Sequence, residues 1–243
     1  MNMYETPRLL AEYLLFHYGA DQEVLPWEFG PREALHFAER SVTHLLEPAS
    51  LAANTRSLDL GCAVGRSCYE LARHSVEVLG IDYSQSFVSA AEAIRREGAL
   101  AYPRLDEGPS QTLLVATRPS EGEHGRIRFE QGDALNLRAD IGCFDFVHAA
   151  NLLCRLAEPQ RLLERLPELV NPGGQLLLTT PCTWLEEFTP TEHWPQGSTF
   201  EWLKEKLYPH FMLAHREDLP FLIREHARKF QWSVALGTRW VRR

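Results

Sequence analysis

The sequence has no hydrophobic run long enough to cross a membrane. A spanning helix needs about 20 consecutive apolar residues, and none of the apolar runs in the 243 residues approaches that length. The N-terminal residues also lack the pattern of a secretory signal, in which a basic segment precedes an apolar one. We therefore expect a cytoplasmic protein without a membrane partner.

Clusters of positive charge are equally scarce. The chain carries 25 Lys and Arg against 33 Asp and Glu, which gives a formal net charge of -8. This balance repels polyanions, and no segment gathers enough basic residues to overcome it. Arg239, Arg242 and Arg243 are interpreted as a solvated end of the chain. We expect a small-molecule substrate and no nucleic-acid partner.

Paired cysteines are also missing. The five cysteines, at positions 62, 68, 143, 154 and 182, form no Cys-x-x-Cys pair. Metal sites and disulfide scaffolds show regular cysteine and histidine spacings. The ten histidines are scattered, and His210 and His215 do not have the i, i+4 spacing of a helical metal pair. The sequence predicts reduced thiols and no bound metal.

What the sequence does contain is a short apolar strand followed by a glycine turn, over residues 57–67. Glycines at a strand-to-helix turn let backbone N–H groups and a helix N-terminus approach a ligand closely. A second apolar run at 76–81 ends on Asp82, and an acidic residue there can accept hydrogen bonds from ribose hydroxyls. The two segments together predict a nucleoside-bearing cofactor at the carboxyl edge of a parallel sheet.

The glycine spacing distinguishes between cofactors. A dinucleotide fingerprint is Gly-x-Gly-x-x-Gly, whereas here Ala63 stands between Gly61 and Gly65. Asp59 precedes this turn and is expected to lie near a cationic group, which S-adenosylmethionine provides and a pyrophosphate does not. A nicotinamide-dependent reductase is disfavoured, since a catalytic Tyr-Lys pair is also missing. The pattern Asp-x-Gly-x-x-x-Gly resembles the first motif of class I methyltransferases, with alanine in place of the usual central glycine.

Three later segments resemble further methyltransferase motifs, in the same order along the chain. Residues 126–134 read as a strand ending in Gly-Asp-Ala, where Asp133 can accept from an adenine amino group. Residues 144–151 read as a strand that opens toward the transferred methyl group, and 171–179 as a turn and a buried strand. The resemblance implies S-adenosylmethionine as cofactor and S-adenosylhomocysteine as product. The expected cofactor-binding residues are Asp59, Gly61, Cys62, Ala63, Gly65, Asp82, Tyr83, Asp133, Ala134 and Ala149.

The implied fold is a single α/β domain over residues 1–243. It is Rossmann-like, with a mostly parallel sheet of seven strands and an antiparallel C-terminal strand. We divide the chain into an N-terminal helical cap (1–50), a cofactor-binding core (57–180) with a hairpin insertion (99–125), and a lid with the C-terminal strands (181–243). Because the insertion follows a helix and precedes a strand, it should emerge at the amino edge of the sheet. A role in structure or self-association is therefore expected.

Periodicity and capping residues predict the other elements. Helices are expected over 4–18, ending at Gly19, and over 31–46, 84–97 and 199–208. Residues 25–31 are rich in proline and aromatic residues and are predicted to form a loop. Residues 233–241 read as the last strand, whereas 211–228 are compatible with either a strand or a helix.

A narrower resemblance rests on segments outside the common motifs. Residues 13–19, 25–31, 184–190 and 218–232 resemble the methyltransferase module of ovothiol biosynthesis. That family methylates a ring nitrogen of 5-thiohistidine, and its module usually follows a sulfoxide synthase in a longer chain. The resemblance implies 5-thiohistidine as the amino-acid substrate. Since no synthase portion is recognised here, a separate sulfoxide synthase is the expected functional partner.

Substrate-binding residues are assigned on this basis. Asn151 is expected to orient the ring or the substrate ammonium, as the catalytic residue, or alternatively to cap its loop. The other candidates each have a packing or surface role as the alternative: Tyr18, Trp27 and Phe29 as an aromatic slot, Trp184 as a closing side chain, and Arg224 or Arg228 for the carboxylate. Two other functions stay open, namely methylation of another small nucleophile and a non-catalytic subunit that binds S-adenosylmethionine.

Overall fold

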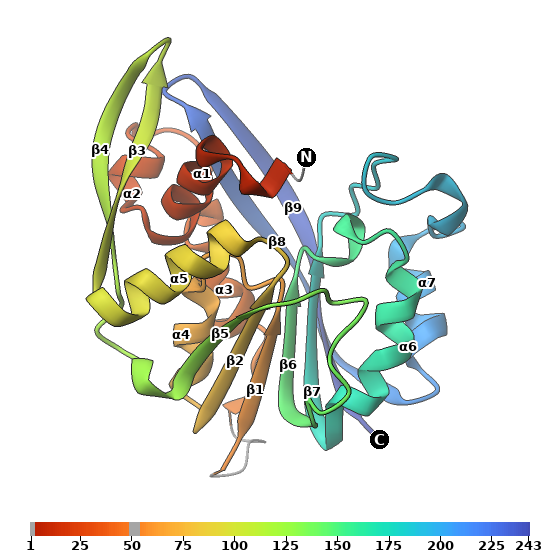
Figure 1. Cartoon of the computed structure of the whole chain (residues 1–243). Helices are drawn as coiled ribbons and strands as arrows, with labels where there is room; N and C mark the ends of the chain where they lie inside the picture. The colour runs from red at the N-terminus through yellow and green to blue at the C-terminus, as the bar shows by residue number, and fades with distance from the viewer. Residues whose placement is uncertain (1–2, 49–53) are drawn as a thin grey trace.

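The computed structural model describes residues 3–48 and 54–243, and a seven-stranded sheet forms its centre (Figure 1). The strand order is β5-β2-β1-β6-β7-β9-β8, and β9 runs antiparallel to both of its neighbours. This confirms the predicted fold. The strands are β1 (Arg56–Leu60), β2 (Glu77–Asp82), β5 (Ile127–Gln131), β6 (Phe144–Ala150), β7 (Val170–Thr180), β8 (Phe211–His226) and β9 (Lys229–Arg242).

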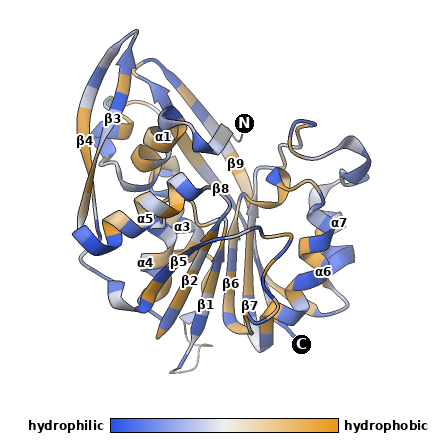
Figure 2. Cartoon of the chain, viewed as in Figure 1, coloured by the Kyte–Doolittle hydropathy of each residue, from blue (hydrophilic) through white to orange (hydrophobic). Residues whose placement is uncertain are grey.

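Helices cover both faces of the sheet, so the central strands direct apolar side chains toward both faces (Figure 2). Leu176 and Leu178 of β7 point into one core together with α6 (Pro159–Leu169) and α7 (Thr199–Leu207). Leu177, between them, points into the opposite core. That second core is formed with α3 (Phe37–Thr43) and α4 (Arg66–Ala72), and α5 (Gln85–Glu97) packs nearby against β5 and β2.

The N-terminal residues form a cap in which α1 (Pro7–Tyr18) is the longest helix. Its end confirms the prediction, since the helix stops before Gly19. It begins later than residue 4, because the Thr6 side chain accepts a hydrogen bond from the Leu9 N–H at 3.3 Å and caps the helix, and a separate 3-10 turn, η1 (Met3–Glu5), precedes it. The predicted helix over 31–46 is wrong. His36 has a left-handed backbone with φ of 58°, which separates a short 3-10 turn, η2 (Arg32–Ala34), from α3.

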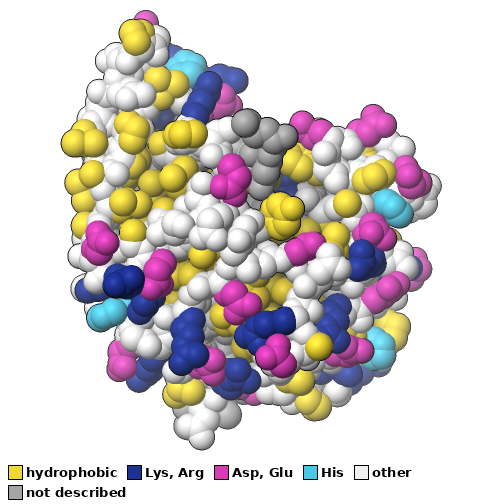
Figure 3. All heavy atoms as spheres, in the orientation of Figure 1, with side chains coloured by type: hydrophobic (Ala, Val, Ile, Leu, Met, Phe, Trp, Pro, Cys, Tyr) yellow, Lys and Arg dark blue, Asp and Glu magenta, His cyan; other side chains and the backbone are white. Residues whose placement is uncertain are grey.

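The hairpin insertion is confirmed as β3 (Ala99–Glu107) and β4 (Ser110–Thr117). It starts from the end of α5 and rises along the cap instead of staying at the amino edge (Figure 1). Tyr102 and Ala116 are buried in one cluster with Leu14 of α1, so the hairpin supports the cap. Its outer face leaves Leu113 and Val115 exposed. Figure 3 shows hydrophobic side chains gathered on the side of the molecule where the hairpin lies. Self-association through this face stays a prediction.

The C-terminal part of the chain is a long antiparallel ribbon. The segment 211–228, which the sequence left open, is the strand β8, and β9 is longer than the predicted last strand. The ribbon extends past the sheet and contacts both α1 and β3. No helix within residues 3–48 and 54–243 is long and apolar enough to cross a membrane.

Replacing Gly65 tests how tightly the glycine turn is packed. We expect Gly65→Ala to lower the free energy of unfolding by about 1–3 kcal/mol more than Gly108→Ala. Both glycines have positive φ, at 83° and 55°, but only at position 65 would a Cβ overlap the Phe129 ring; around Gly108 nothing lies within 4 Å. Urea denaturation followed by circular dichroism measures both variants. Equal losses would contradict close packing at Gly65.

Candidate active site

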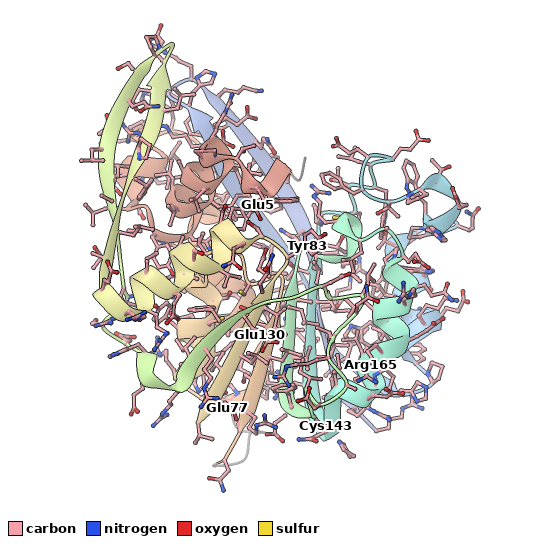
Figure 4. The ribbon with its side chains drawn as sticks, in the orientation of Figure 1. Glu5, Glu77, Tyr83, Glu130, Cys143 and Arg165 are labelled. Carbon is pink, nitrogen blue, oxygen red and sulfur yellow. The ribbon has the colours of Figure 1, made fainter. Side chains whose placement is uncertain are left out.

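A cavity of about 570 Å³ lies at the carboxyl ends of the parallel strands. The residues that follow β1, β2, β5, β6 and β7 all contribute to its lining. In Figure 4, Tyr83, which follows β2, marks this end of the sheet, and Glu5 of the N-terminal turn lies above it. Glu77 and Cys143 mark the opposite, amino end. The cap closes the cavity from above, since Tyr4 and α1 also line it.

The glycine turn forms the floor of the cavity. The Gly61 and Cys62 N–H groups both donate to the carbonyl of Ile81, at 2.8 and 3.1 Å. Ala63 has a left-handed backbone with φ of 48°, as a glycine would, and its N–H donates to Asp82 Oδ2 at 2.9 Å. Alanine therefore keeps the turn that the methyltransferase motif requires. Gly61, Cys62 and Ala63 line the cavity, whereas Gly65 packs against Phe129 and Ala149 points into the core below α6.

Asp82 is placed to hold a ribose. Its Oδ1 accepts from the Ser84 N–H at 2.9 Å and its Oδ2 from Ala63, which aims the carboxylate into the cavity. Burial raises the pKa of Asp82 to about 6, despite these two backbone donors. A ligand with two adjacent hydroxyls would supply the missing donors, so the residues present fit an adenosine cofactor.

Asp59 lies deeper and already has partners. His148 Nδ1 lies 2.7 Å from its Oδ1, and Ser67 donates to Oδ2 at 2.6 Å. Burial raises the pKa of Asp59, but His148, Ser67 and Cys68 outweigh it and the net direction is downward. The carboxylate thus stays ionised beneath the turn, where its charge could attract a cationic ligand. The sequence did not single out His148, although a histidine between Val147 and Ala149 inside a buried strand was the available signal.

The end of the cavity that the sequence predicts to hold the adenine lies after β5. Asp133 and Ala134 line it as predicted, and Tyr83 lies at its rim, 64% exposed. The Asp133 carboxylate accepts from the Leu135 N–H at 2.8 Å and from Asn136 Nδ2 at 2.6 Å. It therefore shapes this turn in addition to facing the cavity.

Asn151 both caps its loop and faces the cavity. Its backbone is left-handed, with φ of 54°, and its N–H donates to Thr179 Oγ1 at 3.1 Å. The same hydroxyl donates back to Asn151 Oδ1 at 2.9 Å. Because this pair holds the amide oxygen, the Nδ2 group is the donor that the side chain offers to a ligand. This orientation favours binding an acceptor atom of the substrate over binding its ammonium.

The proposed aromatic slot does not line the cavity. Tyr18 donates to the carbonyl of Val64 at 2.8 Å, behind the glycine turn. Trp27 stacks on Phe29 at 5.5 Å in the cap, and Phe29 is 73% exposed. The prediction of an aromatic slot from these three residues is therefore wrong. Aromatic composition alone does not show which surface a helix end or a loop packs on.

Trp184 and Arg224 are also placed elsewhere. Trp184 Nε1 donates to Thr199 at 3.0 Å, and its ring packs edge-on against Trp202 of α7. Arg224 is 5% exposed and donates to the carbonyl of Glu23 at 2.8 Å, joining β8 to the cap. Arg228, the alternative to Arg224, lies in the exposed turn after β8. Neither arginine lines the cavity.

Other side chains, which the sequence did not single out, form the actual walls. Arg155 is the only lysine or arginine among the described lining residues, and its guanidinium lies 4.7 Å from the centre of the Phe188 ring. No group of three or more His, Cys, Asp or Glu side chains in the described ranges could hold a metal. Besides Tyr83 and His148, the aromatic and imidazole side chains of the walls are Tyr4, Tyr13, Phe16, His17, Phe37, Phe87, Phe188 and Phe221.

This fold and this cavity are those of the class I S-adenosylmethionine-dependent methyltransferase superfamily. Residues 34–221 match the family described as "Methyltransferase domain", and the chain belongs to that family. It is similar to a putative S-adenosylmethionine-dependent methyltransferase from Listeria monocytogenes, with a TM-score of 0.54, 15% identity, and coverage of 85% of this chain and 98% of that one. The [4+2]-cyclase SpnF gives a TM-score of 0.56 at 22% identity over 89% of this chain and 74% of that one. These two likenesses show the fold.

Curated relatives differ in the acceptor that they are named for. The ubiquinone biosynthesis O-methyltransferase of Coxiella burnetii is 27% identical over 51% of this chain and 42% of its own length. The human mitochondrial citrate synthase-lysine N-methyltransferase is 29% identical over 62% of this chain and 60% of its own. The trans-aconitate 2-methyltransferase of Deinococcus radiodurans is 32% identical over 51% and 37%. The chain thus spans less than two thirds of each of these relatives.

The pKa of Asp82 predicts a pH-dependent cofactor affinity. Protonation below about pH 6 removes the charge that strengthens hydrogen bonds from ribose hydroxyls. Affinity for S-adenosylhomocysteine, measured by isothermal titration calorimetry, should therefore fall as the pH is lowered through this value. Asp82→Asn should bind more weakly at neutral pH and lack the bend near pH 6. A bend that persists in the variant would assign the titration to another group.

Proposed function

We propose that this chain transfers a methyl group from S-adenosylmethionine to an imidazole ring nitrogen of 5-thiohistidine. The observation that carries the proposal is the position of the segments that resemble the ovothiol family. Three of the four, 13–19, 184–190 and 218–232, contribute side chains to the one cavity, although they lie far apart in the sequence. The fourth, 25–31, packs within the cap. Most of the segments with the narrower resemblance therefore lie where they could contact a ligand.

The size and walls of the cavity support a small, flat acceptor. A volume of about 570 Å³ is in the range of small-molecule sites, which is about 300–1,000 Å³. Aromatic side chains from α1, α3, α5, β8 and the loop after β7 supply planar surfaces suited to a ring. Arg155 supplies a positive charge for the carboxylate of an amino acid, the role that the sequence had assigned to Arg224.

This methyl transfer requires the ring nitrogen to be aligned with the methyl group more than it requires a strong base. S-adenosylmethionine, when bound, supplies an electrophilic methyl group on a sulfonium. A neutral imidazole nitrogen already carries a lone pair, so holding the ring in line is the main task of the protein. Asn151 Nδ2 can orient an acceptor atom of the substrate, while the aromatic walls set the plane of the ring. A separate sulfoxide synthase would supply the thiol substrate.

Substituting Asn151 separates orientation from cofactor binding. Asn151→Ala should lower kcat/KM by about tenfold through loss of one hydrogen bond, with affinity for S-adenosylhomocysteine unchanged. Because residue 151 has a left-handed backbone, Asn151→Gly is the matched control that removes the amide without backbone strain. A steady-state assay should give similar losses for both. Full activity in the glycine variant would remove Asn151 from the site.

Calorimetric titration tests the acceptor itself. In protein saturated with S-adenosylhomocysteine, 5-thiohistidine should bind at least tenfold more tightly than histidine. Arg155→Met should weaken binding of the thiol compound, since the charge that pairs with its carboxylate is lost. If neither compound binds while the cofactor product does, the proposed acceptor is wrong and the enzyme methylates another small nucleophile.

A further inference from the structure

His17 is a cavity residue that no motif accounts for. It lies near the end of α1, and its ring packs against Phe16 and Tyr13 at centroid distances of 5.3 and 5.9 Å. These rings belong to the same wall of the cavity. An apolar side chain at this position would satisfy the packing of α1 as well as a histidine does. The presence of a polar ring here therefore indicates a role beyond packing.

The His17 ring is neutral, and one of its two nitrogens lacks a hydrogen-bond partner in the part of the chain that the structure describes. Burial lowers the pKa of His17 to about 3, although the charge of Asp59 opposes this shift. Nδ1 is buried and has no hydrogen-bond partner among the described residues. A neutral imidazole carries one N–H donor and one acceptor lone pair, on different nitrogens. Burying the N–H without a partner costs more free energy than burying the lone pair without one. The favoured tautomer thus leaves the bare Nδ1 against the wall and the N–H on Nε2.

His17 lies at the end of the cavity that is formed by the glycine turn. The next residue, Tyr18, donates to the carbonyl of Val64 and so fixes the end of α1 against the glycine turn. The charges of Asp59 and Arg66 both act on the His17 ring. Asp82, which would hold the ribose, is the last residue of the neighbouring strand β2. His17 therefore lies on the glycine-turn side of the cavity, beside the pocket that the ribose would occupy.

We propose that His17 donates a hydrogen bond from Nε2 to an amino-acid carboxylate in the cavity. Asp59, Asp82 and Asp133 make the lining mostly negative, and Arg155 is the only Lys or Arg among the described lining residues. The cavity therefore offers few donors to a ligand carboxylate, and His17 adds one. A buried N–H bonded to a charged group gives a strong hydrogen bond without adding a buried charge. The carboxylate comes from the methionyl portion of the cofactor or from the methyl acceptor, and only the second source rests on the proposed function.

Two ligands that differ by the amino-acid portion test the first source. S-adenosylhomocysteine carries the carboxylate, and 5′-methylthioadenosine is the matched control that lacks it. By calorimetry, His17→Phe should weaken binding of the first by tenfold or more and leave the second unchanged. His17→Gln, which keeps a donor, should restore part of the loss. The melting temperature of unliganded His17→Phe should equal or exceed that of the wild type, because an unpaired buried polar atom is removed.

The other possible outcomes of these binding measurements also distinguish between the roles of His17. Unchanged S-adenosylhomocysteine binding with weakened 5-thiohistidine binding would assign the carboxylate to the acceptor. If neither ligand is affected, or if both adenosine ligands weaken together with a lower melting temperature, His17 has a packing role and the inference is wrong. Failure of the proposed function looks different: wild-type protein would then bind no 5-thiohistidine, while the comparison of the two adenosine ligands would still decide the role of His17 toward the cofactor.

Discussion

The carboxylate of Asp82 is the point on which the site depends. By accepting from Ala63 and Ser84, it ties the glycine turn after β1 to the start of α5. The connections that follow β1 and β2 are thereby held in fixed positions relative to each other at the edge of the cavity. The cost is a buried carboxylate with a raised pKa, and such a group is useful only where a ligand completes its hydrogen bonds. Cofactor recognition and the local geometry of the sheet edge thus have one cause.

Around this common core, the cap gives the cavity its individual character. Its walls come from α1, α3, β8 and the loop after β7, which the fold brings together from both ends of the chain. Relatives that share the core are named for different acceptors. The side chains that could distinguish one acceptor from another, such as Phe188 and Phe221, therefore lie outside the cofactor motifs. Arg155 follows β6 and places a cation against this aromatic wall.

The sequence predicted the core well and the substrate walls poorly, for a physical reason. A buried parallel strand followed by glycines has a distinctive apolar pattern, so the turn at 61–65 and the positions of Asp82 and Asp133 could be predicted. Trp27 and Trp184 were misplaced, since a loop rich in aromatic residues does not reveal which surface it packs on. His36 broke a helix through a left-handed backbone that its residue type did not signal. His17 lay on a correctly predicted helix, yet only the packed structure shows that its ring lacks a partner.

One carbonyl has a consequence for how the chain assembles. The oxygen of Glu23 accepts from Arg104 of the hairpin at 3.1 Å and from Arg224 of β8 at 2.8 Å, and the Ala227 N–H donates to the carbonyl of Asp106. Three segments separated by most of the sequence thus meet at one place. Contacts of such long sequence separation form late, because loop closure must be completed first. The sheet is therefore expected to fold before the cap closes over it, and the cap to be the first region to exchange its amide hydrogens in the native protein.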